Sequence, residues 1–139
     1  MNISEKLQSG FVFFDGGMGT LLQERGLKAG ELPESWNISR PEIITEIHRA
    51  YFEAGANVVT TNTFGANPLK IDNVDKIVAA AVKNARAAIF DKEQYVALDI
   101  GPTGKLLKPL GDLDFESAVS AFSKTVKAGD KAGCDLIII

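Results

Sequence analysis

Four short apolar runs, separated by three segments with helical periodicity, constrain the fold of this chain more than any other feature. The runs lie at residues 11–15, 57–63, 95–100 and 134–139 and are rich in branched and aromatic side chains. Runs of this length and composition predict strands buried on both faces. Strands that alternate with helices favour parallel pairing, so the sequence predicts a βαβαβαβ chain of the α/β class.

The intervening segments, 40–54, 73–90 and 114–132, each carry an apolar face wide enough to cover a sheet. Gly55 and Gly133 would each end one of these helices. The sequences around the two glycines are similar, and they are separated by two strand–helix units. Such a repeat is typical of a (β/α)8 TIM barrel, whose eight units take about 250 residues. We therefore expect residues 1–139 to be one partial domain, the N-terminal half of a TIM barrel with four parallel strands, truncated at the fourth.

The first predicted strand runs directly into Asp15-Gly-Gly-Met-Gly-Thr20, which is the strongest candidate for a ligand site. Gly16, Gly17 and Gly19 permit a sharp turn and a close approach of the backbone to a ligand, because no Cβ is in the way. Backbone N–H groups and one carboxylate would then face the carboxyl end of the sheet. A phosphate loop fits less well, since Gly104-Lys105 lacks the upstream glycine and the following Ser or Thr of a P-loop.

Polar side chains also follow the second and third predicted strands. Asn62 stands at the end of one and Asp99 at the end of the other. Because binding groups of α/β barrels gather at the carboxyl ends of the strands, we expect Asp15, Asn62 and Asp99 to converge on one ligand. Such a set suits a ligand with an ammonium and a carboxylate, with Asp15 facing the cation and the glycine amides facing the anion.

Each of these residues also has a purely structural interpretation. The glycines could form only a tight connection, Asp15 could cap a helix, and Asn62 with Thr61 could hydrogen-bond loop backbone. Asp99 could likewise bind the ligand or have only a structural role. Trp36, in the long connection at 27–38, is expected to pack that loop against the core.

Composition excludes several classes of function. The 139 residues carry 15 Lys and Arg against 18 Asp and Glu, a net charge of -3, so no basic surface predicts binding to nucleic acid or to anionic membranes. No signal-peptide pattern is present, and no apolar run reaches the ~18 residues of a membrane span, so we expect a cytoplasmic protein with a small-molecule ligand. One cysteine and one histidine cannot complete a zinc site. We expect His48 to be a packed or half-exposed helix residue and Cys134 a small buried hydrophobe.

Four motifs, in order along the chain, resemble those of the homocysteine S-methyltransferase family. They are Asp15-Gly-Gly-Met-Gly-Thr20, Asn37-Ile-Ser-Arg-Pro-Glu42, the segment from His48 to Phe64 with its Glu-Ala-Gly-Ala and Thr-Asn-Thr-Phe, and Gly101-Pro-Thr103. The resemblance spans nearly the whole chain, and the combination is more specific than any one motif. The resemblance is strongest to the N-terminal homocysteine-binding module of the cobalamin-dependent methionine synthase branch.

The resemblance implies a (β/α)8 barrel that transfers a methyl group, in this branch from methylcobalamin, to the zinc-activated thiol of homocysteine to give methionine. It implies that Asp15 binds the substrate, that Gly16 and Gly17 are backbone donors, and that Asn62 is the polar residue of the second strand. Three zinc-binding cysteines and a further acidic residue would lie beyond residue 139. Cobalamin and methyl-folate would bind to other domains of a longer chain, and the segment alone would be inactive.

The sequence departs from the family pattern at two positions. Thr60 stands where close relatives often have Glu, and Asp99 stands where a small or apolar residue is more usual. The methyl donor stays open, because betaine-dependent and S-methylmethionine-dependent relatives share the barrel and its first loop, although the 27–42 segment favours the cobalamin branch.

Two other functions remain alternatives. One is a half-barrel that self-associates through the open edges of its first and fourth strands. The other is a phosphate-binding barrel enzyme, which is less favoured because barrel phosphate sites usually come from the last strands.

Overall fold

Three parallel strands lie side by side in chain order in the computed structural model, which describes residues 2–139. They are β1 (Val58–Thr60), β2 (Tyr95–Asp99) and β3 (Leu136–Ile138). Val58 lies opposite Tyr95, and Ala97 lies opposite Leu136, so the strands run in the same direction and end at the same edge of the sheet. The α/β class predicted from the sequence is confirmed.

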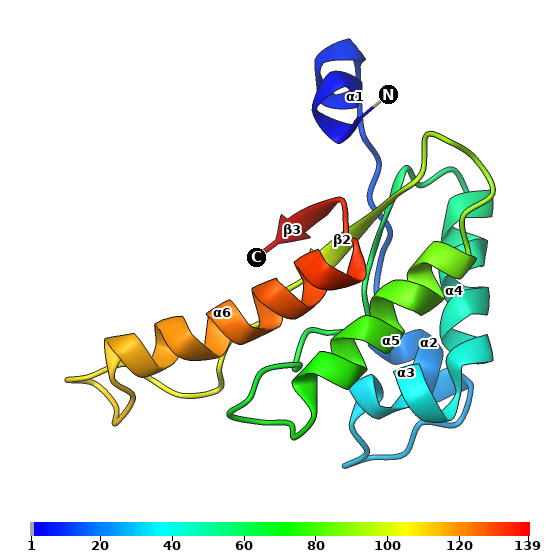
Figure 1. Cartoon of the computed structure of the whole chain (residues 1–139). Helices are drawn as coiled ribbons and strands as arrows, with labels where there is room; N and C mark the ends of the chain where they lie inside the picture. Colours follow the sequence, from blue (N-terminus) through cyan, green and yellow to red (C-terminus); the bar gives the residue numbers. More distant parts are fainter. Residues whose placement is uncertain (1) are drawn as a thin grey trace.

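Helices connect the strands and cover the sheet (Figure 1). Those in residues 2–139 are α1 (Ile3–Ser9), α2 (Gly19–Glu24), the 3-10 turn η1 (Pro33–Ser35), α3 (Trp36–Ser39), α4 (Pro41–Glu53), α5 (Val74–Ala87) and α6 (Phe115–Ala132). The last three fall within the helices predicted at 40–54, 73–90 and 114–132. The glycines expected after α4 and α6 adopt left-handed backbone angles, with φ of 105° at Gly55 and 87° at Gly133, as helix-ending glycines do.

The main core lies between the sheet and helices α4, α5 and α6. Val59, Val96 and Leu98 belong to this core, and all three side chains are 0% exposed. Burial of an apolar side chain of this size stabilises a fold by roughly 1.5–3 kcal/mol. The same core holds the strand ends at fixed positions, and the polar residues that follow the strands depend on those positions.

The opposite face of the sheet packs against α1, which stands apart from the other helices in Figure 1. Ile3 of α1 packs against the cluster that contains Val58 and Ala97. Lys6 of α1 also forms an ion pair with Glu93, in the turn that precedes β2. The first helix therefore contacts this face of the sheet at Ile3 and is joined to the turn before β2 by the ion pair.

The prediction of a first strand buried on both faces at 11–15 is wrong. Phe14 forms only an isolated parallel bridge with Val58, and the Asp15 amide donates to the Val58 carbonyl at 2.9 Å. Phe11 is 88% exposed and Phe13 63% exposed. Within residues 2–139 this segment lies at the edge of the sheet, and an edge segment lacks the neighbour that would bury its apolar side chains.

Three residues were predicted from the sequence to have structural roles, and of these Trp36 and His48 are buried whereas Cys134, expected to be buried, is half-buried. Trp36 is buried, and its indole N–H donates to Glu31 at 2.9 Å, so the long connection is packed down as expected. His48 is fully buried within α4, and desolvation lowers its pKa to about 4, which keeps the ring neutral. Cys134 is half-buried, and burial raises the pKa of its thiol, so it is a poor candidate for a nucleophile.

No helix within residues 2–139 combines the length and the apolar character needed to cross a membrane.

A close contact at Gly101 provides a test of the packing. A Cβ at this position would lie 2.2 Å from the Phe64 carbonyl oxygen and 2.8 Å from the Phe64 ring. Gly101→Ala should therefore lower the free energy of unfolding by about 1–3 kcal/mol, the usual cost of overpacking. Urea denaturation would measure the loss beside Gly10→Ala, where an added Cβ meets nothing within 4 Å. Equal stability of the two variants would show that the Gly101 contact is not tight.

Candidate functional site: an acidic pocket at the carboxyl end of the sheet

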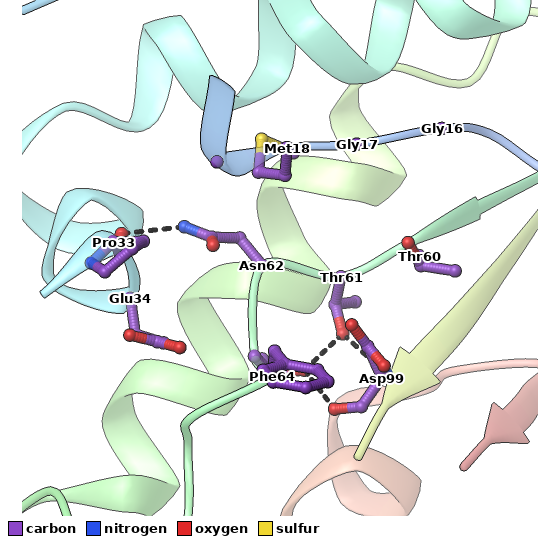
Figure 2. Close-up of a pocket in the computed structure, with 12 residues that line it drawn as sticks. Gly16, Gly17, Met18, Pro33, Glu34, Thr60, Thr61, Asn62, Phe64 and Asp99 are labelled. Atoms are coloured by element: carbon purple, nitrogen blue, oxygen red, sulfur yellow. Dashed lines mark hydrogen bonds between the residues drawn. The ribbon is translucent and has the colours of Figure 1, made fainter. Parts of the chain in front are cut away.

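A pocket of about 360 Å³ opens where the strands end. Its walls are residues 16–19 of the glycine loop, Pro33 and Glu34 of η1, residues 60–64 after β1, and Asp99 at the end of β2 (Figure 2). The location agrees with the sequence prediction, because parallel strands bring the segments that follow them to one edge. Four predicted residues, Gly16, Gly17, Asn62 and Asp99, line this single pocket.

The glycine loop presents unpaired backbone donors to the pocket. The N–H groups of Gly16, Gly17 and Met18 make no hydrogen bond within residues 2–139. On the other side of the loop, the Tyr51 hydroxyl of α4 donates to the Gly17 carbonyl at 2.7 Å. A trans peptide points its carbonyl and its N–H in opposite directions, so this bond turns the Met18 N–H away from Tyr51.

Asp15 lies behind the glycine loop rather than in the pocket wall. One carboxylate oxygen accepts from the Thr60 amide at 2.8 Å, and the other accepts from the Thr60 hydroxyl at 3.0 Å. Desolvation raises the pKa of Asp15 to about 6, a rise that the two Thr60 hydrogen bonds oppose and the charge of Asp99 supports. Asp15 borders a second hollow, which Phe13 and Tyr51 also line. The sequence prediction that Asp15 contacts the ligand stays a prediction.

Two other carboxylates line the pocket itself. Asp99 is half-buried, and its pKa is raised by desolvation and then by the negative charge of Glu34. Glu34 is only 5% exposed, and its Oε1 accepts from the Gly65 amide at 2.6 Å. No residue that lines the pocket is Lys, Arg or His, and none of the ion pairs within residues 2–139 includes Asp15, Glu34 or Asp99. The pocket therefore carries uncompensated negative charge.

Asn62 holds the pocket wall together. Its side-chain amide donates to the Pro33 carbonyl at 2.8 Å, and its own carbonyl accepts from the Asn37 side chain at 2.7 Å. Thr61 accepts from the Asp99 amide at 3.1 Å, which joins the ends of β1 and β2. The structural interpretation of Asn62 and Thr61 is thus confirmed, and it coexists with their place in the pocket lining.

Sequence reasoning missed Glu34. The segment 27–38 was interpreted as a packed connection, and no spacing rule predicts that its one 3-10 turn folds back over the ends of β1 and β2. A signal was present, because Glu34 is separated by only one residue, Ser35, from the buried Trp36 and Asn37. A charged residue close to two buried ones is a candidate for burial itself.

The described residues do not fit a zinc site. No group of three or more His, Cys, Asp and Glu side chains within residues 2–139 is placed to hold a metal ion. His48 is buried in α4, Cys134 lies two residues before the amino end of β3, and neither lines the pocket. What these residues can do chemically is bind and orient a ligand that carries a cation beside an anion.

Comparison with known proteins places the chain among methyltransferases. The model of the homocysteine S-methyltransferase family matches residues 12–139. The chain is 29% identical, over 157 aligned positions and 99% of its length, to the methionine synthase of Mycobacterium leprae (strain TN). It is 32% identical over 90% of its length to the methionine synthase of Mycobacterium tuberculosis (strain ATCC 25618 / H37Rv). It spans only 13% and 12% of these two relatives.

Solved structures share the fold. The crystal structure of the metallated form of the homocysteine methyltransferase MmuM from Escherichia coli aligns with a TM-score of 0.81 over 96% of this chain and 55% of that one, at 23% identity. The apo form of the same protein aligns with a TM-score of 0.72 over 94% of this chain and 49% of that one, at 26% identity. The arrangement of strands and helices is therefore that of a known homocysteine methyltransferase.

The raised pKa of Asp15 predicts how stability depends on pH. Because the folded-state pKa of about 6 exceeds the ordinary value of 3.8, the folded protein binds this proton more tightly than the unfolded chain does. The contribution of Asp15 to stability should be fully present below the ordinary pKa and lost as the pH rises through about 6. Asp15→Asn keeps an acceptor for the Thr60 amide and a donor for its hydroxyl, but it cannot titrate. Urea denaturation from about pH 4 to pH 7 should therefore show a smaller loss of stability in the variant than in the wild type.

The titration of His48 changes the stability in the opposite direction as the pH rises in that experiment. Its lowered pKa makes stability rise with pH between about 4 and its ordinary value of 6.5. This contribution is the same in both proteins and cancels in their difference. Identical pH profiles of wild type and Asp15→Asn would contradict the burial of the Asp15 charge.

Proposed function

Because the chain belongs to the homocysteine S-methyltransferase family, we propose that it is the substrate-binding part of an enzyme that methylates the thiol of homocysteine to give methionine. The observation that carries the proposal is the pocket in which free backbone N–H groups stand beside carboxylates that have no basic partner. Homocysteine has an ammonium and a carboxylate on one carbon, and these two kinds of group complement its two charges.

The amino acid end of homocysteine would bind at the glycine loop. Its carboxylate would accept hydrogen bonds from the amides of Gly16 and Gly17 and from that of Met18. Its ammonium would lie on the acidic side of the pocket, where Asp99 lines the wall and Asp15 adds negative charge from behind Thr60. Asn62 would keep the wall in place through its bond to Pro33.

In the reaction, a bond forms between sulfur and the methyl carbon, the bond from the methyl group to its donor breaks, and the thiol proton leaves. Residues 2–139 hold no set of metal ligands, so their part is to bind and orient the substrate. Activation of the sulfur by zinc, on cysteines beyond residue 139, is part of the proposal, as is methylcobalamin as the methyl donor. Cobalamin and methyl-folate would be bound by other domains of a longer protein, since the chain spans 12–13% of its curated relatives.

We also propose that residues 1–139 are the first half of a (β/α)8 barrel that the remaining half completes. The alignment covers 55% of the MmuM chain, and the edge segment at 11–15 leaves Phe11 and Phe13 exposed. The same exposed edge supports self-association of the half-barrel as the second candidate. A phosphate-binding enzyme is not proposed, because the acidic pocket would repel phosphate.

Substitution of Asp15 tests whether the ligand binds at the first loop. In the full-length protein, Asp15→Ala should weaken the binding of L-homocysteine at least tenfold, or about 1.4 kcal/mol, because it removes one charge from the acidic side and releases the loop from Thr60. Isothermal titration calorimetry would measure the change beside Asp72→Ala, which removes an exposed aspartate outside the pocket. Equal binding by wild type and Asp15→Ala would mean that the glycine loop is only a structural turn.

Substitution of Tyr51 tests the part of the same pocket that would bind the carboxylate of the substrate. Tyr51→Phe deletes only the hydroxyl that fixes the Gly17 carbonyl, a hydrogen bond worth about 0.5–1.5 kcal/mol. We expect roughly threefold to tenfold weaker binding of L-homocysteine. Binding of 3-aminopropane-1-thiol, which lacks the carboxylate, should not change. If the variant binds both ligands more weakly by the same factor, the hydroxyl does not act through the carboxylate-binding amides.

A further inference from the structure

Glu34 is a buried carboxylate that the proposed binding residues leave without a role. It lies in η1, within the connection between α2 and α3, yet it lines the pocket opposite residues that follow the strands (Figure 2). Its Oε1 accepts from the Gly65 amide. Its Oε2 makes no hydrogen bond within residues 2–139 and no ion pair. Glu34 is 5% exposed and lines the pocket, so Oε2 is available to a cationic group of a ligand.

The backbone around Glu34 is fixed before any ligand arrives. The Asn62 side chain donates to the Pro33 carbonyl at 2.8 Å, and the Asn37 side chain donates to the Glu34 carbonyl at 3.0 Å. The Ser35 hydroxyl donates to the Leu32 carbonyl at 2.7 Å, which closes the turn. A side chain held on such a turn loses little conformational entropy when it binds, so Glu34 is preorganised.

Glu34 is also coupled to a second carboxylate. Its charge raises the pKa of Asp99, so the two acids lie near enough to repel each other. A cation between them would remove this repulsion and supply the partner that each lacks. Asp15 is less suited to that direct contact, because both of its oxygens already accept from Thr60 and it lies outside the pocket lining.

We propose that Glu34, together with Asp99, is a specificity-determining residue that binds the ammonium group of the substrate. The inference rests on the proposed function and deepens it, since it names the group that distinguishes an amino acid thiol from other thiols. The free Oε2 of Glu34 contacts the ammonium, while Oε1 stays on the Gly65 amide. A thiol without an amino group leaves both carboxylates unpaired and gains nothing from Glu34.

The test compares two ligands in two variants of the full-length protein. Glu34→Gln keeps an acceptor for the Gly65 amide but removes the charge. Calorimetry should show L-homocysteine binding weakened at least tenfold and 4-mercaptobutanoate, which lacks the amino group, unchanged. Glu31→Gln is the matched control, because Glu31 is an exposed acid of the same connection that accepts from Trp36 and lies outside the pocket lining. It should leave the binding of both ligands unchanged.

Each other outcome overturns the proposal. If Glu34→Gln weakens both ligands alike, or neither, Glu34 only supports the loop, while the proposed function stands. If the wild-type protein binds 4-mercaptobutanoate as tightly as L-homocysteine, the pocket does not recognise an ammonium. If the wild type binds no L-homocysteine, the proposed function fails and this inference fails with it. Thermal unfolding of Glu34→Gln checks that the variant is folded.

Discussion

The two hydrogen bonds between Asp15 and Thr60 are the connection on which the site depends. The segment at 11–15 has only one parallel bridge to β1, and its backbone hydrogen bonds reach Asn57 and Val58 but not Thr60. The Asp15 carboxylate adds two bonds to the last residue of β1 and fixes the point at which the glycine loop begins. Tyr51 then holds the loop from the α4 side. This half-buried carboxylate thus fixes the start of the loop whose residues 16–19 line the pocket, and desolvation raises its pKa.

Local patterns in the sequence were enough to predict the three long helices, α4, α5 and α6, and the end of the sheet at which the candidate pocket lies. The apolar faces of α4, α5 and α6 repeat with helical period, and the polar residues that line the pocket follow strands whose carboxyl ends must meet at one edge. The exposure of Phe11 and Phe13 could not be predicted, because it depends on whether another strand lies beside this edge segment and not on the segment's own sequence. Glu34 was missed for a related reason, since its contact with Gly65 spans a connection with no periodic pattern.

The charge of the pocket suits a zwitterionic ligand better than an anionic one. Glu34 and Asp99 line it, Asp15 lies behind Thr60, and no basic side chain lines it. A simple anion would meet these carboxylates as well as the loop amides, whereas an amino acid can place its ammonium at one end and its carboxylate at the other. The small size of the pocket, about 360 Å³, suits a ligand of the size of an amino acid. The acidic surplus would destabilise the free protein and be relieved on binding.

Thr60 and Asp99, the two positions at which the sequence was expected to depart from the family pattern, lie on neighbouring strands. Thr60 gives both its amide and its hydroxyl to Asp15, and a glutamate at this position would replace that hydroxyl donor with a second carboxylate beside Asp15. In the register of β1 and β2, Thr60 lies opposite Ala97, and Asp99 follows two residues later on the same face of the strand. An acid at 99 therefore adds negative charge to the same pocket without displacing the Thr60 donor. Asp99 supplies a carboxylate to the pocket from the adjacent strand, the charge of Glu34 raises its pKa, and Thr61 accepts from its backbone amide.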